Sequence, residues 1–325
     1  MKTKASLSIL ALLAAAAASF CLGAAPLGAG QLLEAILSGP VTTAGRIFWY
    51  VRLPRTAGCL LAGAALSVAG CVIQNVLANP LASPNIIGVN AGAGLAVTVC
   101  CAFGALSGWT LAAAAFGGAF LAVLAVSAAA RAVGASRTTV VLAGVAVNAT
   151  LGAVSDTVTN LVPEAGMLSS DFRVGGFGTV VPARLVPAGI LIVLALGAVM
   201  LLHNELEILS LGDDAARSLG LNAKRMRTVF LALAAVLCGA AVSFAGLLGF
   251  VGLIVPHAVR RFAGTACKGL LPLCAVWGAA FVTACDILAR MAFRPKELPV
   301  GILLSALGGP FFLFILSKHR RFDEC

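Results

Sequence analysis

Long apolar segments recur along this chain, and each is about long enough to cross a lipid bilayer. A transmembrane helix needs roughly 20 mainly apolar residues. The sequence offers such runs near residues 5–25, 56–77, 86–106, 109–130, 138–160, 183–203, 229–259, 270–289 and 299–317. Only 10% of the 325 residues are charged, compared with about 25% in an ordinary soluble domain. The pattern predicts an all-α polytopic membrane protein with a single transmembrane domain over residues 1–325.

The apolar segment 229–259 is too long for one ordinary crossing. It contains residues that break or kink helices: Gly246, Gly249, Gly252 and Pro256. Two short passes through it place the basic residues of 260–268 and 318–321 in the cytoplasm, whereas one pass would place them outside. Since cytoplasmic loops carry the excess of Lys and Arg, we expect about ten crossings with both termini cytoplasmic. Pro256 would then leave little chain for a full eighth crossing.

The N-terminal segment 1–27 begins with Lys2 and Lys4 ahead of an apolar run. A signal peptide and a first transmembrane span share this pattern. The run continues to Leu27 and is long enough to cross, which favours an uncleaved span over a cleaved signal peptide.

An internal repeat is indicated by two similar octapeptides, GAALSVAG at 63–70 and GAAVSFAG at 239–246. Pro80 and Pro256 follow them at the same offset. On the expected topology the two copies run in opposite directions, as in the inverted repeats of many transporters. Helices rich in Ala and Gly also resemble each other by chance, because small residues serve close packing in any membrane bundle.

The charged residues and cysteines restrict the class of function. The net charge of +10 comes mainly from basic residues in short loops, where they report topology rather than binding to nucleic acid. The ten cysteines are scattered without a CxxC motif, so no metal site and no cofactor are expected. On the outer side, Arg52, Arg55, Arg290 and Arg294 flank span ends against the usual charge bias, which suggests an acidic partner there.

Two connecting segments carry specific signals. The stretch ANPLASPNIIG at 78–88 contains Pro80 and Pro84 between two apolar runs, and prolines end a helix at the preceding residue. In the loop 204–227, Asp213 and Asp214 would form the acidic first turn of a short helix that ends at Gly220. No GxxxxGK[ST] phosphate-binding loop occurs. A docking helix without an ATPase of its own points to a separate cytoplasmic ATPase.

Four stretches together resemble the FecCD-type permease family of ABC importers, which carry iron-siderophores, haem and cobalamin. They are RLPRTAGCLLAGAALSVAGCVIQNVLANPLASPNIIGVNAGAG (52–94), LGDDAARSLGLNAKRMR (211–227), GLLGFVGLIVPHAVRRFAG (246–264) and DILAR with ELPVGILLSALGGPFFLFIL (286–316). The resemblance implies a type II ABC importer permease fold with no catalytic site, in which a separate ABC ATPase hydrolyses ATP.

The resemblance also implies roles for particular residues. The cytoplasmic gate would comprise Asn79, Pro80 and Leu81, with a second constriction at Ala135 and Ser136. The coupling helix that presses on the ATPase would include Gly212, Asp213, Asp214, Ala215, Arg217, Leu219 and Gly220. Arg52, Arg55 and Arg290 would dock glutamates of a substrate-binding protein at an exposed interface.

The family's assembly implies several partners for this chain. They are two ABC ATPase subunits in the cytoplasm, a periplasmic or lipid-anchored substrate-binding protein outside, and a second permease chain that forms a homodimer or a close pseudodimer. The expected location is the inner (cytoplasmic) membrane, with multiple passes. An iron(III)-siderophore is the first choice of cargo, because iron carriers are the commoner members of the family, with haem and cobalamin as alternatives. Residues 172–177 (FRVGGF) depart from the family's frequent Trp-x-x-Gly-Ser motif and are more like the cobalamin permease.

Two intramembrane acids keep a second class of function open. Asp286 precedes Arg290 by four residues and can pair with it on one helical face. Asp156 has no such partner in the sequence, and intramembrane acids are often functional, so a proton-coupled secondary transporter is the alternative. His257 is expected to serve packing rather than metal binding.

Overall fold

The computed structural model describes residues 2–23, 28–134, 136–293 and 296–320. Within these ranges the regular structure is helical, as predicted, and no strand occurs. The helices of the first half are α1 (Lys2–Cys21), α2 (Ala29–Leu37), α3 (Thr43–Arg46), α4 (Leu53–Val76), α5 (Val89–Ala102), α6 (Gly108–Ala132) and α7 (Arg137–Leu161). Those of the second half are α8 (Pro163–Val174), α9 (Pro182–Leu201), α10 (His203–Ser210), α11 (Asp213–Ser218), α12 (Ala223–Ala245), α13 (Val251–Ala263), α14 (Cys267–Met291) and α15 (Val300–Arg320).

Six helical stretches of the described chain are long and apolar enough to cross a membrane. They are Thr43–Val76, Gly108–Ala132, Arg137–Leu161, Pro182–Leu201, Ala223–Ala245 and Cys267–Met291. Three shorter apolar helices, Ser6–Cys21, Val89–Ala102 and Val300–Leu313, add to them. The first long stretch continues α4 backward through α3 and a π-helical turn, η2 (Ile47–Arg52). The structure thus supports the polytopic membrane fold expected from the apolar segments.

The long apolar segment 229–259 is interrupted, as its glycines predicted. Helix α12 ends at Ala245, residues 246–250 are not helical, and α13 begins at Val251. Helix α13 has 13 residues, which at about 1.5 Å per residue is roughly 20 Å, less than the ~30 Å of a bilayer core. The eighth pass is therefore not a full span by itself, and irregular backbone of this kind is tolerated only where protein or a cavity surrounds it.

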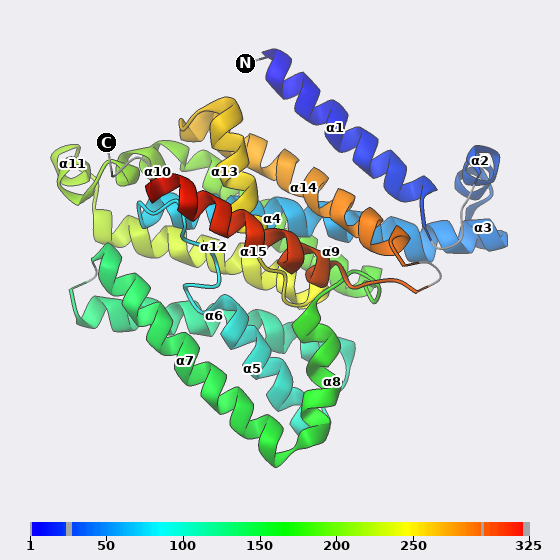
Figure 1. The fold of residues 1–325 in the computed structure, drawn as a ribbon, viewed down its shortest axis with the longest axis horizontal. Coiled ribbons are helices and arrows are strands. Elements are labelled where there is room, and N and C mark those ends of the chain that lie inside the picture. Colours follow the sequence, from blue (N-terminus) through cyan, green and yellow to red (C-terminus); the bar gives the residue numbers. More distant parts are fainter. Residues whose placement is uncertain (1, 24–27, 135, 294–295, 321–325) are drawn as a thin grey trace.

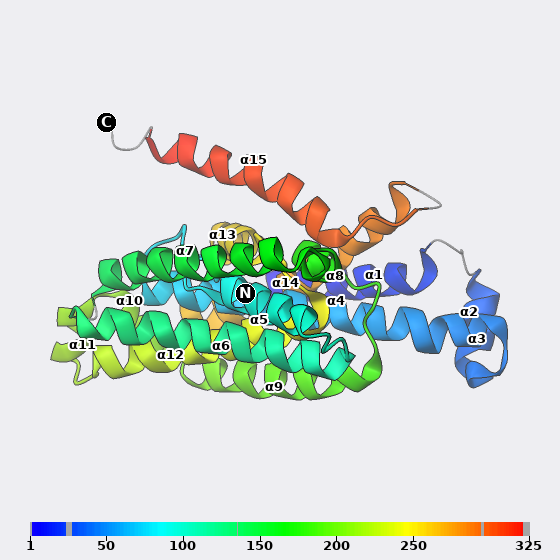
Figure 2. The ribbon, with the colours of Figure 1, turned by 90° about the horizontal axis from the view of Figure 1, so that it is seen from below.

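The core of the bundle centres on α4, which packs against α14 and against α12 (Figure 1). Small side chains let these helices approach closely. Gly63 of α4 faces Gly278 of α14 so closely that a Cβ atom on either residue would overlap the backbone of the other helix. In contrast, only three residues of α7 are buried, Val140, Gly144 and Ser155, and α15 stands away from the body at its C-terminal half (Figure 2).

We expect Gly63→Ala to lower the free energy of unfolding by about 1–3 kcal/mol, because overpacking forces two helices apart. The matched control is Gly197→Ala on α9, where the added methyl group meets no atom within 4 Å beyond the adjoining backbone of its own helix. Thermal unfolding of both purified variants in one detergent measures the difference. Equal midpoint temperatures of unfolding for the two variants would show that α4 and α14 accommodate the added methyl group without a loss of stability.

The two copies of the internal repeat differ in their surroundings. Helices α4 and α12 pack together and run in opposite directions (Figure 1). The first copy lies within α4, whereas the second ends α12, and the chain leaves the helix at Gly246 with φ +70°. Pro80 lies in a turn, but Pro256 lies inside α13. The offset between the octapeptides and their prolines therefore does not correspond to matching local structures.

The bundle has two distinct ends (Figure 1). Helices α10 and α11, the C-terminal end of α4 and the N-terminal end of α7 lie at one end. Helices α2 and α3 and the beginning of α4 lie at the other. Segments that are distant in the sequence thus come together at each end of the bundle. The candidate sites lie at these two ends.

Candidate functional site

The predicted gate segment is a turn between α4 and α5, as expected. Asn79 Oδ1 accepts a hydrogen bond of 2.9 Å from the backbone N of Leu81, and Asn79 O accepts another of 3.1 Å from the backbone N of Ala82. This arrangement is an Asx-type turn, in which the side chain stands in for backbone. Pro80 is exposed and Leu81 is half-buried. The turn thus places Pro80, which has a rigid backbone, next to the apolar side chain of Leu81.

The second predicted constriction lies at the start of α7. Ser136 is the N-cap residue of α7, and its Oγ accepts a hydrogen bond of 3.1 Å from the backbone N of Thr139. Ala135 lies outside the described residues. Arg137 Nη2 donates a hydrogen bond of 2.8 Å to the backbone oxygen of Leu209 in α10. The start of α7 is therefore fastened to the connection between α9 and α12.

The predicted coupling helix is present as α11. Gly212 and Gly220 bracket it with φ values of +121° and +79°, which glycine adopts without the strain of a Cβ atom. Asp213 Oδ1 forms an ion pair of 2.6 Å with Nη2 of Arg227 on α12. Arg227 is only 2% exposed. Helix α11 is therefore joined to a transmembrane helix by a partly buried charge pair.

Sequence reasoning missed one helix of this loop. The sequence predicted one short helix in the loop 204–227, ending at Gly220, but residues 203–210 form a further helix, α10. The buried side chains of Leu206 and Leu209 hold α10 on the bundle, and Glu207 Oε2 accepts a hydrogen bond of 3.2 Å from the backbone N of Cys267, where α14 begins. The i, i+3 spacing of the two leucines was the signal that could have revealed it.

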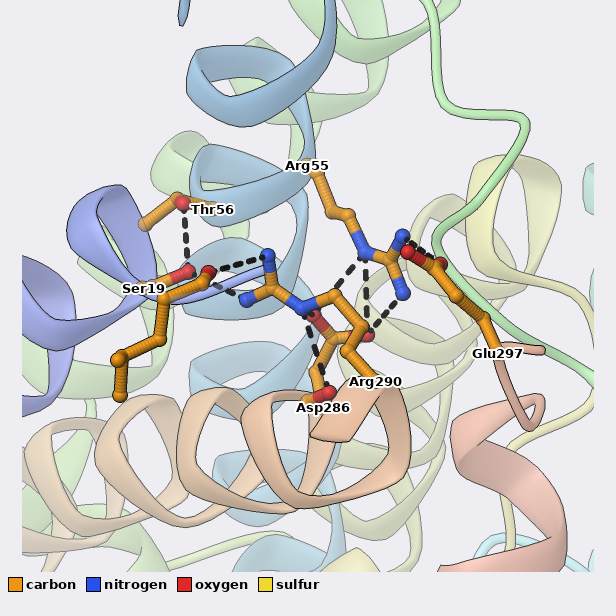
Figure 3. Close-up of polar contacts among 7 residues, drawn as sticks. Ser19, Arg55, Thr56, Asp286, Arg290 and Glu297 are labelled. Carbon is orange, nitrogen blue, oxygen red and sulfur yellow. Dashed lines mark hydrogen bonds and ion pairs between the residues drawn. The ribbon is translucent and has the colours of Figure 1, made fainter. Parts of the chain in front are cut away.

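Two of the predicted docking arginines, Arg55 and Arg290, form an internal cluster with Asp286 and Glu297 (Figure 3). Arg55 binds Asp286 through Nε at 3.1 Å and Nη2 at 3.0 Å, and Arg290 lies 3.0 Å from the same carboxylate. The predicted pair of Asp286 and Arg290 is thus confirmed. Glu297 pairs with Arg55 Nη1 at 2.6 Å.

The expectation that these arginines lie at an exposed surface is wrong for the isolated chain. Arg52, Arg55 and Arg290 are 3%, 7% and 3% exposed. Arg290 Nη2 donates a hydrogen bond of 2.9 Å to Ser19 Oγ of α1, and Arg52 Nη1 donates to the backbone oxygen of Phe20. The guanidinium groups point inward, toward oxygen atoms of α1, of α14 and of the segments that follow these two helices. Arg294 lies outside the described residues.

Asp156 lines a cavity of about 290 Å³ between α5, α7 and α8. Arg173 lines the same cavity and donates hydrogen bonds to Ser155 Oγ at 2.7 Å and Thr98 Oγ1 at 3.2 Å. Among the described residues, no ion pair within 4.0 Å joins either Asp156 or Arg173 to an opposite charge. Sequence reasoning missed Arg173, because nothing in the local pattern shows that α8 brings it beside α7.

Potential metal ligands do not gather in the part of the chain that the structure describes. No group there combines three or more His, Cys, Asp or Glu side chains in a metal-binding arrangement. His257 packs edge-on against Phe311, with ring centroids 5.9 Å apart. This contact fits the packing role expected for that histidine.

Comparison with known proteins decides the family. The FecCD transport family matches residues 10–318 of the sequence. The chain belongs to the FecCD transport family. This FecCD protein is 34% identical to the hemin transport system permease protein of Yersinia pestis, over 92% of each chain. It is 35% identical to the vitamin B12 import system permease protein of Salmonella paratyphi A, over 97% of this chain and 95% of that one.

The fold agrees with this membership. A solved structure described as an inward-facing metal-chelate type ABC transporter superposes on the FecCD chain with a TM-score of 0.85 and 25% identity. The superposition covers 96% of this chain and 97% of that one. The resemblance drawn from the four sequence stretches is therefore confirmed, together with the ABC importer permease fold. As a FecCD family member, the chain is a multi-pass membrane transport permease.

Proposed function

We propose that this chain is the permease subunit of an ATP-driven importer for a metal chelate. Its relatives bear names for hemin, vitamin B12 and iron(3+)-hydroxamate transport, so the chemical class is shared while the cargo differs. We propose an iron(III)-siderophore as the cargo, with haem and cobalamin as alternatives. Two copies of the chain would enclose the path, in the cytoplasmic membrane and with both termini inside.

One observation carries this proposal: the gate turn and α11 lie at the same end of the bundle (Figure 1). A separate ATPase that pulls on α11 would act on α12 through Asp213 and Arg227. Helix α10, which contacts α4 and α14, lies between α11 and the end of α4 that carries the gate turn. Arg137 bonds the same helix from the start of α7. Movement of the coupling segment would thus reach both proposed constrictions.

The proposed gate acts by packing rather than by bond chemistry. Pro80 stiffens the turn and Leu81 provides an apolar side chain that meets its counterpart from the second permease chain. An apolar constriction excludes ions and water, and a small tilt of α4 would open it. Ala135 and Ser136 would close the path beside it.

The proposed outer partner is a substrate-binding protein with acidic side chains, docked near Arg52, Arg55 and Arg290. Arg55 and Arg290 pair with two carboxylates, Asp286 and Glu297, and Arg52 adds a third positive charge close to Arg290. The surplus positive charge at this end supports an acidic partner. Docking of this kind weakens as salt rises, because salt screens the attraction between an approaching acidic protein and the positive charge at this end.

A second candidate function is proton-coupled secondary transport through Asp156. The observation in its favour is the cavity that Asp156 shares with Arg173. This class predicts that a protonophore abolishes uptake and that removal of the ATPase has no effect. The importer predicts uptake that requires ATP hydrolysis and persists without a proton gradient.

The deciding experiment is gentle solubilisation of the tagged chain from its native cell, followed by mass spectrometry of the proteins that co-purify. A chain in which Asp213–Ser218 is replaced by Gly and Ser residues of equal number serves as the control. We expect an ABC ATPase with the intact chain and its loss with the control. If no ATPase co-purifies with the folded chain even after crosslinking, the importer proposal is wrong.

Asn79→Ala is expected to lower import about fivefold, the equivalent of roughly 1 kcal/mol for a lost hydrogen bond that shapes the gate turn. Asn85→Ala is the matched control, since the described bond of that residue uses its backbone oxygen. Uptake into proteoliposomes that contain the purified complex measures the change. An equal effect of the two substitutions would argue against a special role for the Asn79 side chain.

A further inference from the structure

Glu297 is the outermost carboxylate of the arginine cluster. Its side chain is 36% exposed, whereas those of Arg55 and Asp286 are 9% and 1% exposed. It lies in the segment that connects α14 to α15, and its Oε2 approaches Arg55 Nη1 at 2.6 Å (Figure 3). Glu297 therefore covers the solvent side of Arg55, while Asp286 holds the buried side.

The two carboxylates bind different nitrogen atoms of the Arg55 guanidinium. Asp286 accepts from Nε and Nη2 and also pairs with Arg290. Glu297 accepts a hydrogen bond only from Nη1. If Glu297 left, Arg55 would stay fixed by Asp286 and would keep its remaining donor directed at the outer side. This donor would be suited to a carboxylate supplied by another molecule.

Space for such a carboxylate lies next to the pair. A cavity of about 220 Å³ is lined by Arg55, Glu297, Asp171, residues 175–179 and residues 298–300. It lies at the same end as the surplus positive charge of the cluster. An acidic side chain entering this cavity would meet Arg55 in the position that Glu297 occupies.

We propose that Glu297 is a tethered competitor, which an acidic side chain of the docking partner displaces from Arg55. This inference rests on the proposed docking of an acidic outer partner at the arginine cluster. Because Glu297 belongs to the same chain, it is present at high effective concentration. It weakens docking, keeps Arg55 paired while no partner is bound, and selects partners whose acidic group fits the cavity.

The displacement would also reach the start of α15. Gly301, four residues after Glu297, donates a backbone hydrogen bond of 3.2 Å to the oxygen of Gly175 at the end of α8. Leu298 donates one of 3.2 Å to the oxygen of Ala289 in α14. Gly301 approaches Val174 so closely that a Cβ atom would overlap its backbone oxygen. Release of Glu297 would thus loosen the short segment that holds α15 against α8 and α14, which would then depend on these backbone contacts alone.

The test measures the affinity of the purified complex for the binding protein recovered by co-purification, at low and high salt. Glu297→Gln keeps the shape of the side chain and removes its charge. We expect it to tighten docking about three- to tenfold at low salt, because the internal counter-ion is gone. Glu164→Gln is the matched control, since it removes an exposed charge near the start of α8, outside the described cluster.

Arg55→Gln separates this inference from the docking proposal. Asp286 keeps Arg290 as a partner in that variant, so the cluster retains one buried ion pair. If Arg55→Gln leaves docking unchanged, docking through this cluster is wrong. If it weakens docking but Glu297→Gln binds no more tightly than Glu164→Gln, docking stands and the competitor role of Glu297 is overturned.

Hydrogen exchange provides a measurement that needs no partner. In Glu297→Gln, the amides of Leu298, Gly301 and Ile302, which donate the described hydrogen bonds of this segment, are expected to exchange several-fold faster than in the unaltered chain, because the segment has lost its ion pair with Arg55. The same amides in Glu164→Gln are expected to keep their rates. Unchanged exchange in Glu297→Gln would contradict the proposed release of the α15 start.

Discussion

Asp286→Asn is expected to destabilise the protein by about 3–5 kcal/mol, the usual effect of removing one partner from a buried ion pair. Asp286 is 1% exposed and neutralises both Arg55 and Arg290. An amide keeps the size of the side chain but leaves two guanidinium groups close together without the central negative charge. Thermal unfolding of the purified variant in detergent measures the loss.

Asp171→Asn is the matched control for Asp286→Asn. Asp171 is an exposed carboxylate of α8 that forms no described ion pair. The double variant Asp286→Asn with Arg290→Gln removes one of the two cations, so part of the stability is expected to return. If Asp286→Asn unfolds at the same temperature as Asp171→Asn, the cluster does not hold α1, α4 and α14 together.

Asp213→Arg is expected to reduce the cargo moved per ATP hydrolysed at least about tenfold, a change that corresponds to only about 1.4 kcal/mol. Asp213 pairs with Arg227 at 2.6 Å. A second guanidinium in its place repels Arg227 and separates α11 from α12, so force on the coupling helix no longer reaches the membrane. ATP hydrolysis and uptake are measured in the same proteoliposomes.

Asp214→Arg is the control for the coupling prediction. It makes the same change of charge in the same turn of α11, at a residue whose described bond uses its backbone oxygen. A loss of uptake that is equal in both variants would mean that net charge on α11 matters rather than the link to α12. Hydrolysis lost together with uptake would indicate that the ATPase no longer binds.

Much of the fold followed from local patterns. The apolar segments predicted the helices because a bilayer demands continuous backbone hydrogen bonding within each crossing. Pro80 and Pro84 predicted the turn after α4, and Gly212 with Gly220 predicted the limits of α11, since these residues act through their own backbone. The interruption of 229–259 was also visible in its glycines.

The internal pairing of the arginines could not be predicted in the same way. Arg55 and Glu297 are separated by 242 positions in the sequence, and Arg290 and Ser19 by 271. No periodicity or spacing links residues so distant, so charge bias alone suggested an outward role for side chains that point inward. The link between Asp286 and Arg290 was predictable because four residues of helix place them on one face.

The contact between α1 and Arg290 bears on how the chain is processed. Ser19 Oγ, Phe20 O and Leu22 O supply hydrogen-bond acceptors to Arg290 and Arg52, and all three residues lie within the first 27. A signal peptidase that cut after this segment would remove the acceptors and leave two buried guanidinium groups without them. We therefore propose that the N-terminal helix is retained in the mature protein, where its oxygen atoms serve as acceptors for Arg52 and Arg290.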